Sequence, residues 1–425
     1  MIWFLVVGLV VLLALNVPVA FAMLATSIIY LLLLQEVPLI VVAQQVAAGT
    51  DKFLLLAIPF FFLAAEFMST GGIMQRLVEL ARAIVGHVRG GLGQVNVLAS
   101  MMFAGMSGSA VADAAGMGRI EIEMMHRSGY DRGFSGAITA ASATIGPVIP
   151  PSIPFVVYGS LANVSIGKLF LAGIFPGVAM GLFLMGSVWV LAGRRNFPTS
   201  EWAGFDHLAR QFVHSLPVLA LPLIILGGIF SGVFTATESA VVAAAYALLI
   251  GLMMRELRPA DVVPVLIRVG TDTARIMLIV VSATLYSWIL AREGAPQALT
   301  AMVLSLTEEP WLLLVLVNVL LLLLGCFMEP LPIMVIVVPN MLPLVQSLGI
   351  DLTHFGVIVT LNLMIGLITP PIGLVMFTIM DITKVPLDRF SREIWPFLLA
   401  LILVLILVTY VPSVVLLLPE MIYGP

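Results

Sequence analysis

The chain has 425 residues, of which 61% are hydrophobic and 10% are charged, and its formal net charge is −4. Soluble domains carry about 25% charged residues, so this composition excludes an ordinary soluble globule and gives no reason to expect a nucleic-acid partner. The single cysteine excludes an internal disulfide and a cysteine metal cluster. Apolar runs near the roughly 20 residues that cross a lipid bilayer recur along the whole chain. The composition therefore predicts an all-α polytopic membrane protein.

Uninterrupted membrane spans are predicted in chain order at Ile2–Leu15, Pro18–Leu34, Phe53–Met68, Leu171–Ala192, Leu216–Phe230, Ala236–Met254, Thr271–Ala291 and Trp395–Leu418. Two more spans, at about Gly133–Ala162 and Thr353–Asp381, are broken in the middle by proline motifs. The N-terminus has no basic segment and no small-residue cleavage site, so we expect its first apolar run to be retained as a span.

Four other segments have a different character. Ile73–Val88 and Ala260–Arg268 alternate apolar and basic residues at helical spacing, which predicts helices that lie in the membrane interface. Leu92–Met125 and Trp311–Gln346 are apolar but carry turn residues at their midpoints. Each half of these two segments has about 14 residues, or about 21 Å of helix, which is too short to cross the bilayer. We expect both to be re-entrant hairpins.

The two parts of the chain repeat each other. One constant register shift aligns Gly105 with Gly325 and the pair Pro150-Pro151 with Pro370-Pro371. This predicts two halves, residues 1–197 and 216–425, joined by a loop at 198–215. Each half has five spans, one hairpin (about 92–125 and 311–346) and one broken helix (about 133–162 and 353–381). Because five is odd, the second half is inverted relative to the first, an arrangement typical of secondary transporters.

The basic residues predict the orientation. Most of them fall on one face of this topology, and only Lys52, Lys168 and Arg292 fall on the other. Short loops rich in Lys and Arg stay in the cytoplasm, so the first face is expected to be cytoplasmic. Both termini then lie outside, and the two hairpins enter the membrane from opposite sides.

The proline motifs predict cation sites. A proline removes an amide donor and frees a carbonyl oxygen one turn earlier, and glycine lets the helix unwind. Non-helical backbone survives at membrane depth only around a cavity or a ligand, and carbonyl and hydroxyl oxygens suit a hard cation. We predict two related sites, each between a hairpin tip and a broken helix. The first comprises Ser107, Ser109, Gly146, Ile149 and Pro151, and the second comprises Gly325, Glu329, Gly366, Thr369 and Ile372.

The segments GMSGSAVAD at Gly105, ATIGPVIPPSIP at Ala143, CFMEP at Cys326 and LITPPIG at Leu367 resemble motifs of the large membrane subunit of TRAP (tripartite ATP-independent periplasmic) transporters. The resemblance covers essentially the whole chain, although Glu329 stands where the family pattern leads us to expect Asp. It implies an elevator-type importer of an organic acid in the bacterial inner membrane, coupled to at least two Na⁺ ions, with both termini periplasmic.

The same resemblance implies two protein partners, a small four-helix membrane subunit and a periplasmic substrate-binding protein. Since the chain starts directly with the first repeat, we expect the small subunit to be a separate protein. C4-dicarboxylates and sialic acid are both compatible substrates.

The substrate site is expected to lack arginine, because neither hairpin tip nor broken-helix motif contains Lys or Arg. Bound Na⁺, helix N-terminal dipoles and polar side chains would then hold the anion. The predicted substrate-binding residues are Ser109, Asp113, Ser142, Thr144, Ser152, Asn362 and Thr369.

Simpler roles exist for several of these residues. Ser107 and Ser109 are also typical of helix packing through small residues, and Asp113 could bond only the hairpin backbone. Glu66 and Glu238 are expected to be caps or interface residues, and Cys326 a small apolar residue.

Other functional classes fit the sequence less well than transport. An aspartyl-type intramembrane enzyme would need two carboxylates at one depth, whereas Asp113 and Glu329 lie on tips predicted to enter from opposite faces, so we expect no enzyme. A channel would not need inverted halves with occluding hairpins. The closest alternative is a stand-alone sodium/anion symporter of the same architecture that works without a binding protein.

Overall fold

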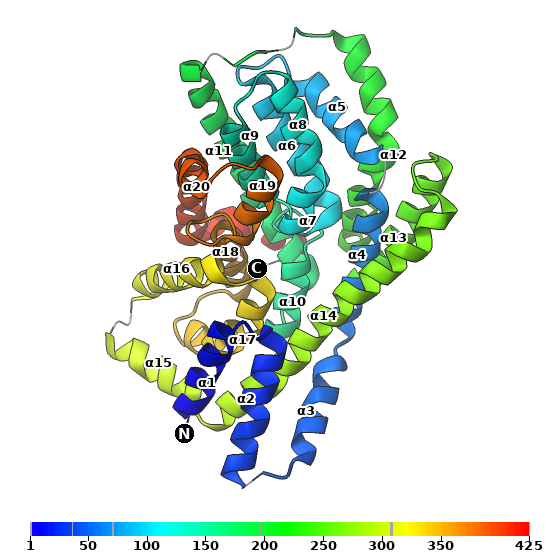
Figure 1. The fold of residues 1–425 in the computed structure, drawn as a ribbon. Coiled ribbons are helices and arrows are strands. Elements are labelled where there is room, and N and C mark those ends of the chain that lie inside the picture. The colour runs from blue at the N-terminus through cyan, green and yellow to red at the C-terminus, as the bar shows by residue number, and fades with distance from the viewer. Residues whose placement is uncertain are drawn as a thin grey trace.

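The computed structural model describes residues 2–35, 37–69, 72–195, 197–199, 201–306 and 309–424. Met1 and Pro425, the two ends predicted to lie outside the membrane, fall outside these residues. All regular secondary structure in the described part is helical (Figure 1).

The first part of the chain forms α1 (Ile2–Ala14), α2 (Val19–Leu34), α3 (Ile40–Thr50), the 3-10 helix η1 (Phe53–Leu56), α4 (Ala57–Ser69), α5 (Ile73–Val85), α6 (Gly91–Ser107), α7 (Ala110–Ala115), α8 (Met117–Arg127), α9 (Arg132–Ala143), α10 (Ile153–Ala162) and α11 (Ile166–Arg195). The second part forms α12 (Phe205–Phe230), α13 (Ala236–Met253), α14 (Pro259–Arg292), α15 (Ala295–Leu306), α16 (Pro310–Phe327), α17 (Pro330–Ser347), α18 (Leu352–Gly366), α19 (Leu374–Thr383), α20 (Leu387–Tyr410) and α21 (Pro412–Tyr423).

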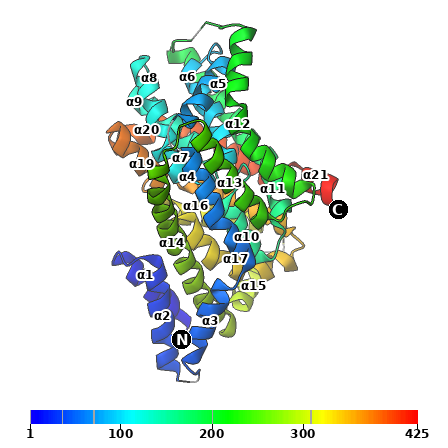
Figure 2. The ribbon, with the colours of Figure 1, turned by 90° about the vertical axis from the view of Figure 1, so that its right-hand side faces the viewer.

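The helices form two groups. In one, α13 packs along α4 and α12, and the long helix α14 packs against α2, α3 and α4 (Figures 1 and 2). In the other, α6 packs on α9, α16 on α18, and both α9 and α18 on α20. Contacts of α14 with α17 and of α4 with α6 join the groups.

Length and composition agree with a membrane protein that crosses the bilayer several times. Seven helices of the described chain are long and apolar enough to cross, or eight if α3 and α4, which bend by 56° at their break, count as one span. The seven include α11, α12, α13, α14 and α20, which occupy predicted spans, and also α16 and α17. The protein is therefore a multi-pass membrane protein.

The prediction of a separate interfacial helix at Ala260–Arg268 is wrong. These residues form the start of α14, one continuous helix of 34 residues. Its charged residues are tolerated inside the long helix because they pair: Arg268 contacts Glu66 at 3.4 Å, and Arg275 contacts Asp272 at 3.2 Å. The charge pattern that suggested an interface thus marks a polar stripe along α14.

The second hairpin segment has longer arms than expected. Helices α16 and α17 contain 18 residues each, or about 27 Å of helix, instead of about 14 residues. In the first hairpin segment α6 has 17 residues, but the return path is split into α7 and α8 at Gly116.

Local capping explains where several helices start. Asp131 caps α9 by accepting hydrogen bonds from the amides of Gly133 and Phe134, and Asp351 caps α18 through the amide of His354. Glu238, expected to be a cap, forms a capping box with Thr235 at the start of α13.

Candidate functional site

The first hairpin tip lies against the first helix break. The chain turns at Gly108, between α6 and α7, and a Cβ built on this glycine would lie 2.9 Å from the carbonyl oxygen of Pro151. Between α9 and α10 the chain is non-helical, and Ser109 caps α7 by accepting a 3.4 Å hydrogen bond from the Ala112 amide. The structure therefore brings Ser107, Ser109 and Pro151 into one neighbourhood.

Asp113 fills the space beside Gly146 at this break. Its side chain is 4% exposed, and a Cβ on Gly146 would overlap its Oδ2. The Ser107 hydroxyl is near enough to interact electrostatically. Among the described residues, however, neither carboxyl oxygen of Asp113 has a hydrogen-bond partner with good geometry. A buried carboxylate in this state needs a proton or a cation to balance it.

A buried polar network holds the first hairpin to α9. The Asn96 side chain on α6 donates to Glu121 Oε2 on α8 at 2.7 Å and to the Thr139 hydroxyl on α9 at 2.8 Å. It also accepts from the Ser142 hydroxyl at 2.8 Å, and Ser100 donates to Ser142. These bonds tie α6, α8 and α9 together as one unit.

The second hairpin tip contacts the second break through the backbone atoms of two glycines. A Cβ on Gly366 would lie 2.6 Å from the Cα of Gly325, so the two chains touch where neither has a side chain. The Cys326 thiol bonds the carbonyl oxygens of Thr369 at 3.0 Å and Pro370 at 3.4 Å. Cys326 is thus more than a small apolar residue, because it closes the tip onto the break.

A second polar contact matches the first network. Asn362 on α18 donates to Asn318 Oδ1 on α16 at 2.7 Å, and Asn318 donates to the Thr409 hydroxyl at 3.1 Å. Both asparagines are buried, so each hairpin is fixed to the helix that precedes its own break.

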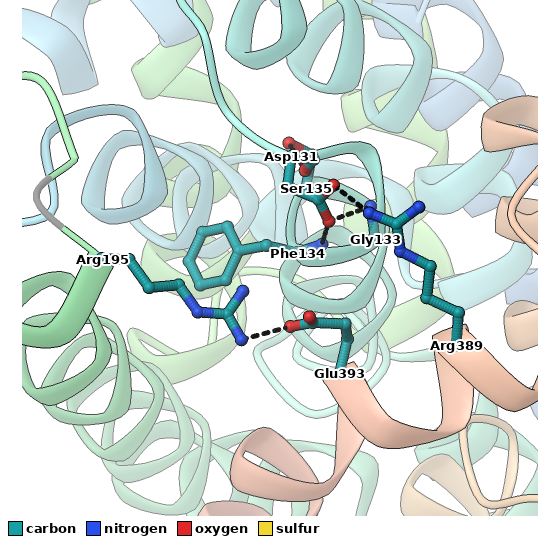
Figure 3. Close-up of polar contacts among 7 residues, drawn as sticks. All are labelled: Asp131, Gly133, Phe134, Ser135, Arg195, Arg389 and Glu393. Atoms are coloured by element: carbon teal, nitrogen blue, oxygen red, sulfur yellow. Dashed lines mark hydrogen bonds and ion pairs between the residues drawn. The ribbon is translucent and has the colours of Figure 1, made fainter.

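The start of α9 is joined to α20 by an ion pair and to α11 by a cation–π contact. Figure 3 shows Arg389 of α20 bonded to Asp131, and Glu393 bonded to Arg195 at 2.9 Å. The Arg195 guanidinium also lies 5.6 Å from the centre of the Phe134 ring. The first broken helix is therefore held at the start of α9 by α11 from the first part of the chain and α20 from the second.

The two tips and the two breaks meet at one cavity of about 980 Å³. The first tip contributes Ser107 and Ser109, and the second contributes Glu329. Pro147 and Leu367 from the breaks complete this wall, and α4 and α14 form the opposite wall. A smaller cavity of about 500 Å³ lies between α5 and α12.

Several predicted substrate residues bond the backbone instead. Thr144 donates to Ala141 O, Thr369 donates to Ile365 O, and Ser152 caps α10 while donating to Pro147 O. Some break carbonyls are used as well: Ile145 O accepts from the amides of Val148 and Ile149. The cavity lining, in the part of the chain that is described, does not include Asp113, Ser142, Thr144, Ser152, Asn362 or Thr369.

The cavity is lined by arginines, although the tips and proline motifs themselves contain none. Arg119 on α8 and Arg268 and Arg275 on α14 all line it. None belongs to a hairpin tip or a proline motif, so inspection of those motifs could not find them. Glu121 was also missed, although an acidic residue in an apolar hairpin is a signal that could have revealed it.

Comparisons with known proteins agree with this architecture. The family model described as "Tripartite ATP-independent periplasmic transporter, DctM component" matches residues 6–414. The chain is 40% identical over 410 residues to the sialic acid TRAP transporter large permease protein SiaM of Vibrio cholerae, with 96% of both chains covered. It is 42% identical over 372 residues to the C4-dicarboxylate TRAP transporter large permease protein DctM of Pseudomonas aeruginosa, with 87% of both covered.

The fold also resembles the crystal structure of the YdaH transporter of Alcanivorax borkumensis. The TM-score is 0.63, the identity is 14%, and the match covers 90% of this chain and 89% of that one. At this identity the likeness concerns the fold alone. The family match and the two full-length relatives, however, show that the chain belongs to the DctM component family, the large permeases of tripartite ATP-independent periplasmic transporters.

Proposed function

We propose that this protein imports an organic acid across the bacterial inner membrane by sodium-coupled secondary transport. The carrying observation is a cavity lined by both hairpin tips and both helix breaks, in a chain related over nearly its whole length to permeases named for sialic acid and C4-dicarboxylates. These two carboxylate classes are the proposed substrates.

The proposed coupling ions bind where each tip meets its break. The first Na⁺ site uses Ser107, Ser109, Gly146, Ile149 and Pro151, and the second uses Gly325, Glu329, Gly366, Thr369 and Ile372. The contact of Gly108 with Pro151 and of Gly325 with Gly366 supports this pairing of tip and break. The Asp113 carboxyl is buried and lacks a hydrogen-bond partner of good geometry among the described residues, which supports a positive charge at the first site.

The proposed transport cycle moves the hairpins and broken helices as an elevator against a fixed wall. The buried polar contacts that tie α6 to α9 and α16 to α18 support a rigid moving unit. The cavity between this unit and α4 with α14 supports a sliding boundary at that place.

The proposed repeat relates residues 1–197 to residues 216–425, with the second half inverted and both termini periplasmic. In the same register Asp131 and Asp351 both cap helices that precede a break. The short helix α15 also stands where the register places the counterpart of α5.

The proposed partners are a small four-helix membrane subunit and a periplasmic substrate-binding protein. The family description as one component of a tripartite periplasmic transporter supports both. The binding protein would deliver the acid to the cavity.

Reconstitution tests the proposal. Proteoliposomes containing this protein and its small subunit should accumulate sialic acid or succinate only with external Na⁺ and the binding protein. Equal uptake when K⁺ replaces Na⁺ would contradict sodium coupling. Sodium-dependent uptake without the binding protein would favour the stand-alone symporter.

A further inference from the structure

The charged residues around the central cavity are unevenly paired. Six charged residues of the described part of the chain line it: Glu66, Arg119, Arg268, Asp272, Arg275 and Glu329. Four of them form two ion pairs, Arg268 with Glu66 and Arg275 with Asp272. The Glu329 carboxyl interacts electrostatically with Arg275 and Asp272 on α14. The remaining charge is the guanidinium of Arg119.

Arg119 is exposed at the cavity wall and makes no hydrogen bond or ion pair with the residues that the structure describes. The carboxylate that interacts with it electrostatically is Asp381, and this residue is already bonded to Lys384 at 2.6 Å. Arg119 therefore keeps its donors available to a molecule in the cavity, whereas Arg268 and Arg275 would have to exchange an existing partner.

The backbone beneath Arg119 is firmly placed. The neighbouring Gly118 faces the other way, toward α9 and α19, where its Cβ would lie 2.9 Å from Thr139 Cγ2 and 3.3 Å from Ile379 Cδ1. Two residues after Arg119, Glu121 joins the buried network with Asn96. Arg119 thus belongs to the same hairpin unit as the first tip, and it faces the same cavity.

Arginine suits the class of ligand proposed for this cavity. Its planar guanidinium offers parallel N–H donors that match the two oxygens of a carboxylate, and it stays charged at any physiological pH. We propose, on the basis of the proposed function, that Arg119 binds the carboxylate group of the transported acid. The anion then has a fixed protein cation in addition to bound Na⁺, on the element that moves with it.

Substrate protection of a cysteine reporter tests this role without measuring transport. The chain has a single cysteine, Cys326, which is buried, so the unsubstituted protein supplies the background rate. Ala115 is exposed and lines the cavity near Arg119, so Ala115→Cys places a thiol beside the bound acid. Its alkylation by N-ethylmaleimide would be followed in Na⁺ buffer with increasing sialic acid or succinate. The same measurement would be made with the methyl ester of sialic acid and the dimethyl ester of succinate.

Loss of the guanidinium should weaken protection by the acid only. In the Ala115→Cys protein, Arg119→Gln should raise the half-protecting acid concentration by about tenfold or more, as expected when a charge-assisted contact is lost. Arg119→Lys keeps the charge but loses the parallel pair of N–H donors, so its half-protecting acid concentration should lie between those of the parent and Arg119→Gln. The ester has no carboxylate, so any protection that it gives should be the same in the parent and in the Arg119→Gln protein.

Arg127→Gln is the matched control, because Arg127 lies on the same helix, is bonded to Glu123 and does not line the cavity. It should leave protection unchanged. Equal protecting concentrations of acid in the parent and in Arg119→Gln would overturn the role of Arg119. Failure of both acids to protect the parent would instead count against the proposed function.

Discussion

The two helix breaks occupy equivalent places in the proposed repeat but are closed in different ways. At the first, the Asp113 carboxyl lies beside Gly146, and the segment from Thr144 to Ser152 is almost entirely buried. At the second, the backbones of Gly325 and Gly366 touch directly, and Ile372 is 40% exposed. In the register of the proposed repeat, the residue equivalent to Asp113 is Ile333, which is apolar and buried.

Two breaks with the same backbone motif can therefore differ in the charged groups that surround them. Only the first break holds a buried carboxyl beside its glycine, because Glu329 of the proposed second site lines the cavity and interacts electrostatically with Arg275. Arg275 partly balances the charge of Glu329, whereas the Asp113 oxygens have no hydrogen-bond partner with good geometry among the described residues, so the proposed first site should have the higher sodium affinity.

Gly366→Ala should abolish uptake. The added methyl group would meet the backbone of Gly325 at 2.6 Å, and backbone cannot rotate away as a side chain can. Overpacking of this kind costs about 1–3 kcal/mol and would separate the second tip from its break. Uptake assays and thermal unfolding measure both effects. Gly186→Ala is the control, since its Cβ meets nothing within 4 Å; equal behaviour of the two variants would contradict the contact.

Gly146→Ala should also be severe, but its cost in stability should depend on Asp113. The obstacle is the end of a side chain, Asp113 Oδ2, so Asp113→Ala should relieve the clash. A double-mutant cycle on unfolding free energy should show a coupling of about 0.5–3 kcal/mol. Additive effects of the two substitutions would show that the carboxyl does not occupy this space.

Asn96→Ala should destabilise the protein more than Asn318→Ala. Asn96 has polar partners on α8 and α9, including the carboxylate of Glu121, whereas Asn318 bonds Asn362 and Thr409. Each buried group left without a partner costs about 1–3 kcal/mol. Thermal melting in detergent should rank the two variants, and the reverse order would contradict the asymmetry between the hairpins.

Glu256 provides a reference acid outside both breaks. A hydrogen bond from Arg76 and another from the Gly72 amide lower the pKa of this carboxyl. A lowered pKa in the folded state stabilises the protein above the unfolded pKa of Glu, about 4.3, and this stabilisation is lost as the pH falls through the folded value. The contribution should be below about 1 kcal/mol.

Melting temperatures measured from pH 7 to 3 should therefore fall less in Glu256→Gln than in the unsubstituted protein. An identical acid dependence would show that this pair contributes nothing to stability.

The class of the protein could be predicted from its sequence because the signals are local. Apolar run lengths indicated a membrane protein, and the glycine and proline motifs indicated the TRAP large permeases, which the family match confirms. The continuity of α14 could not be predicted, because basic residues at helical spacing, among them Arg268, are also typical of a helix in the membrane interface. The Arg275–Asp272 pair is local, three residues apart on one helix, whereas the Arg268–Glu66 pair joins two helices and is supplied only by the folded chain.

The cavity could not be predicted from the sequence either, because its lining comes from helices that only the folded chain brings together. Arg119 and Glu329 lie on different hairpins, and Arg268 lies on a helix outside both. The close approach of Asp113 to Gly146 likewise joins residues that no local pattern pairs. Tip and break residues could be proposed from the repeat, whereas the charges around them depend on tertiary packing.

Equilibrium binding of radioactive ²²Na⁺ to the purified protein tests the central claim most directly, namely that tips and breaks form two unequal cation sites. At least two saturable sites are expected. Asp113→Asn should weaken the tighter one, and Gly366→Ala should remove only the weaker one. Absence of saturable binding, or binding unchanged by both substitutions, would contradict it.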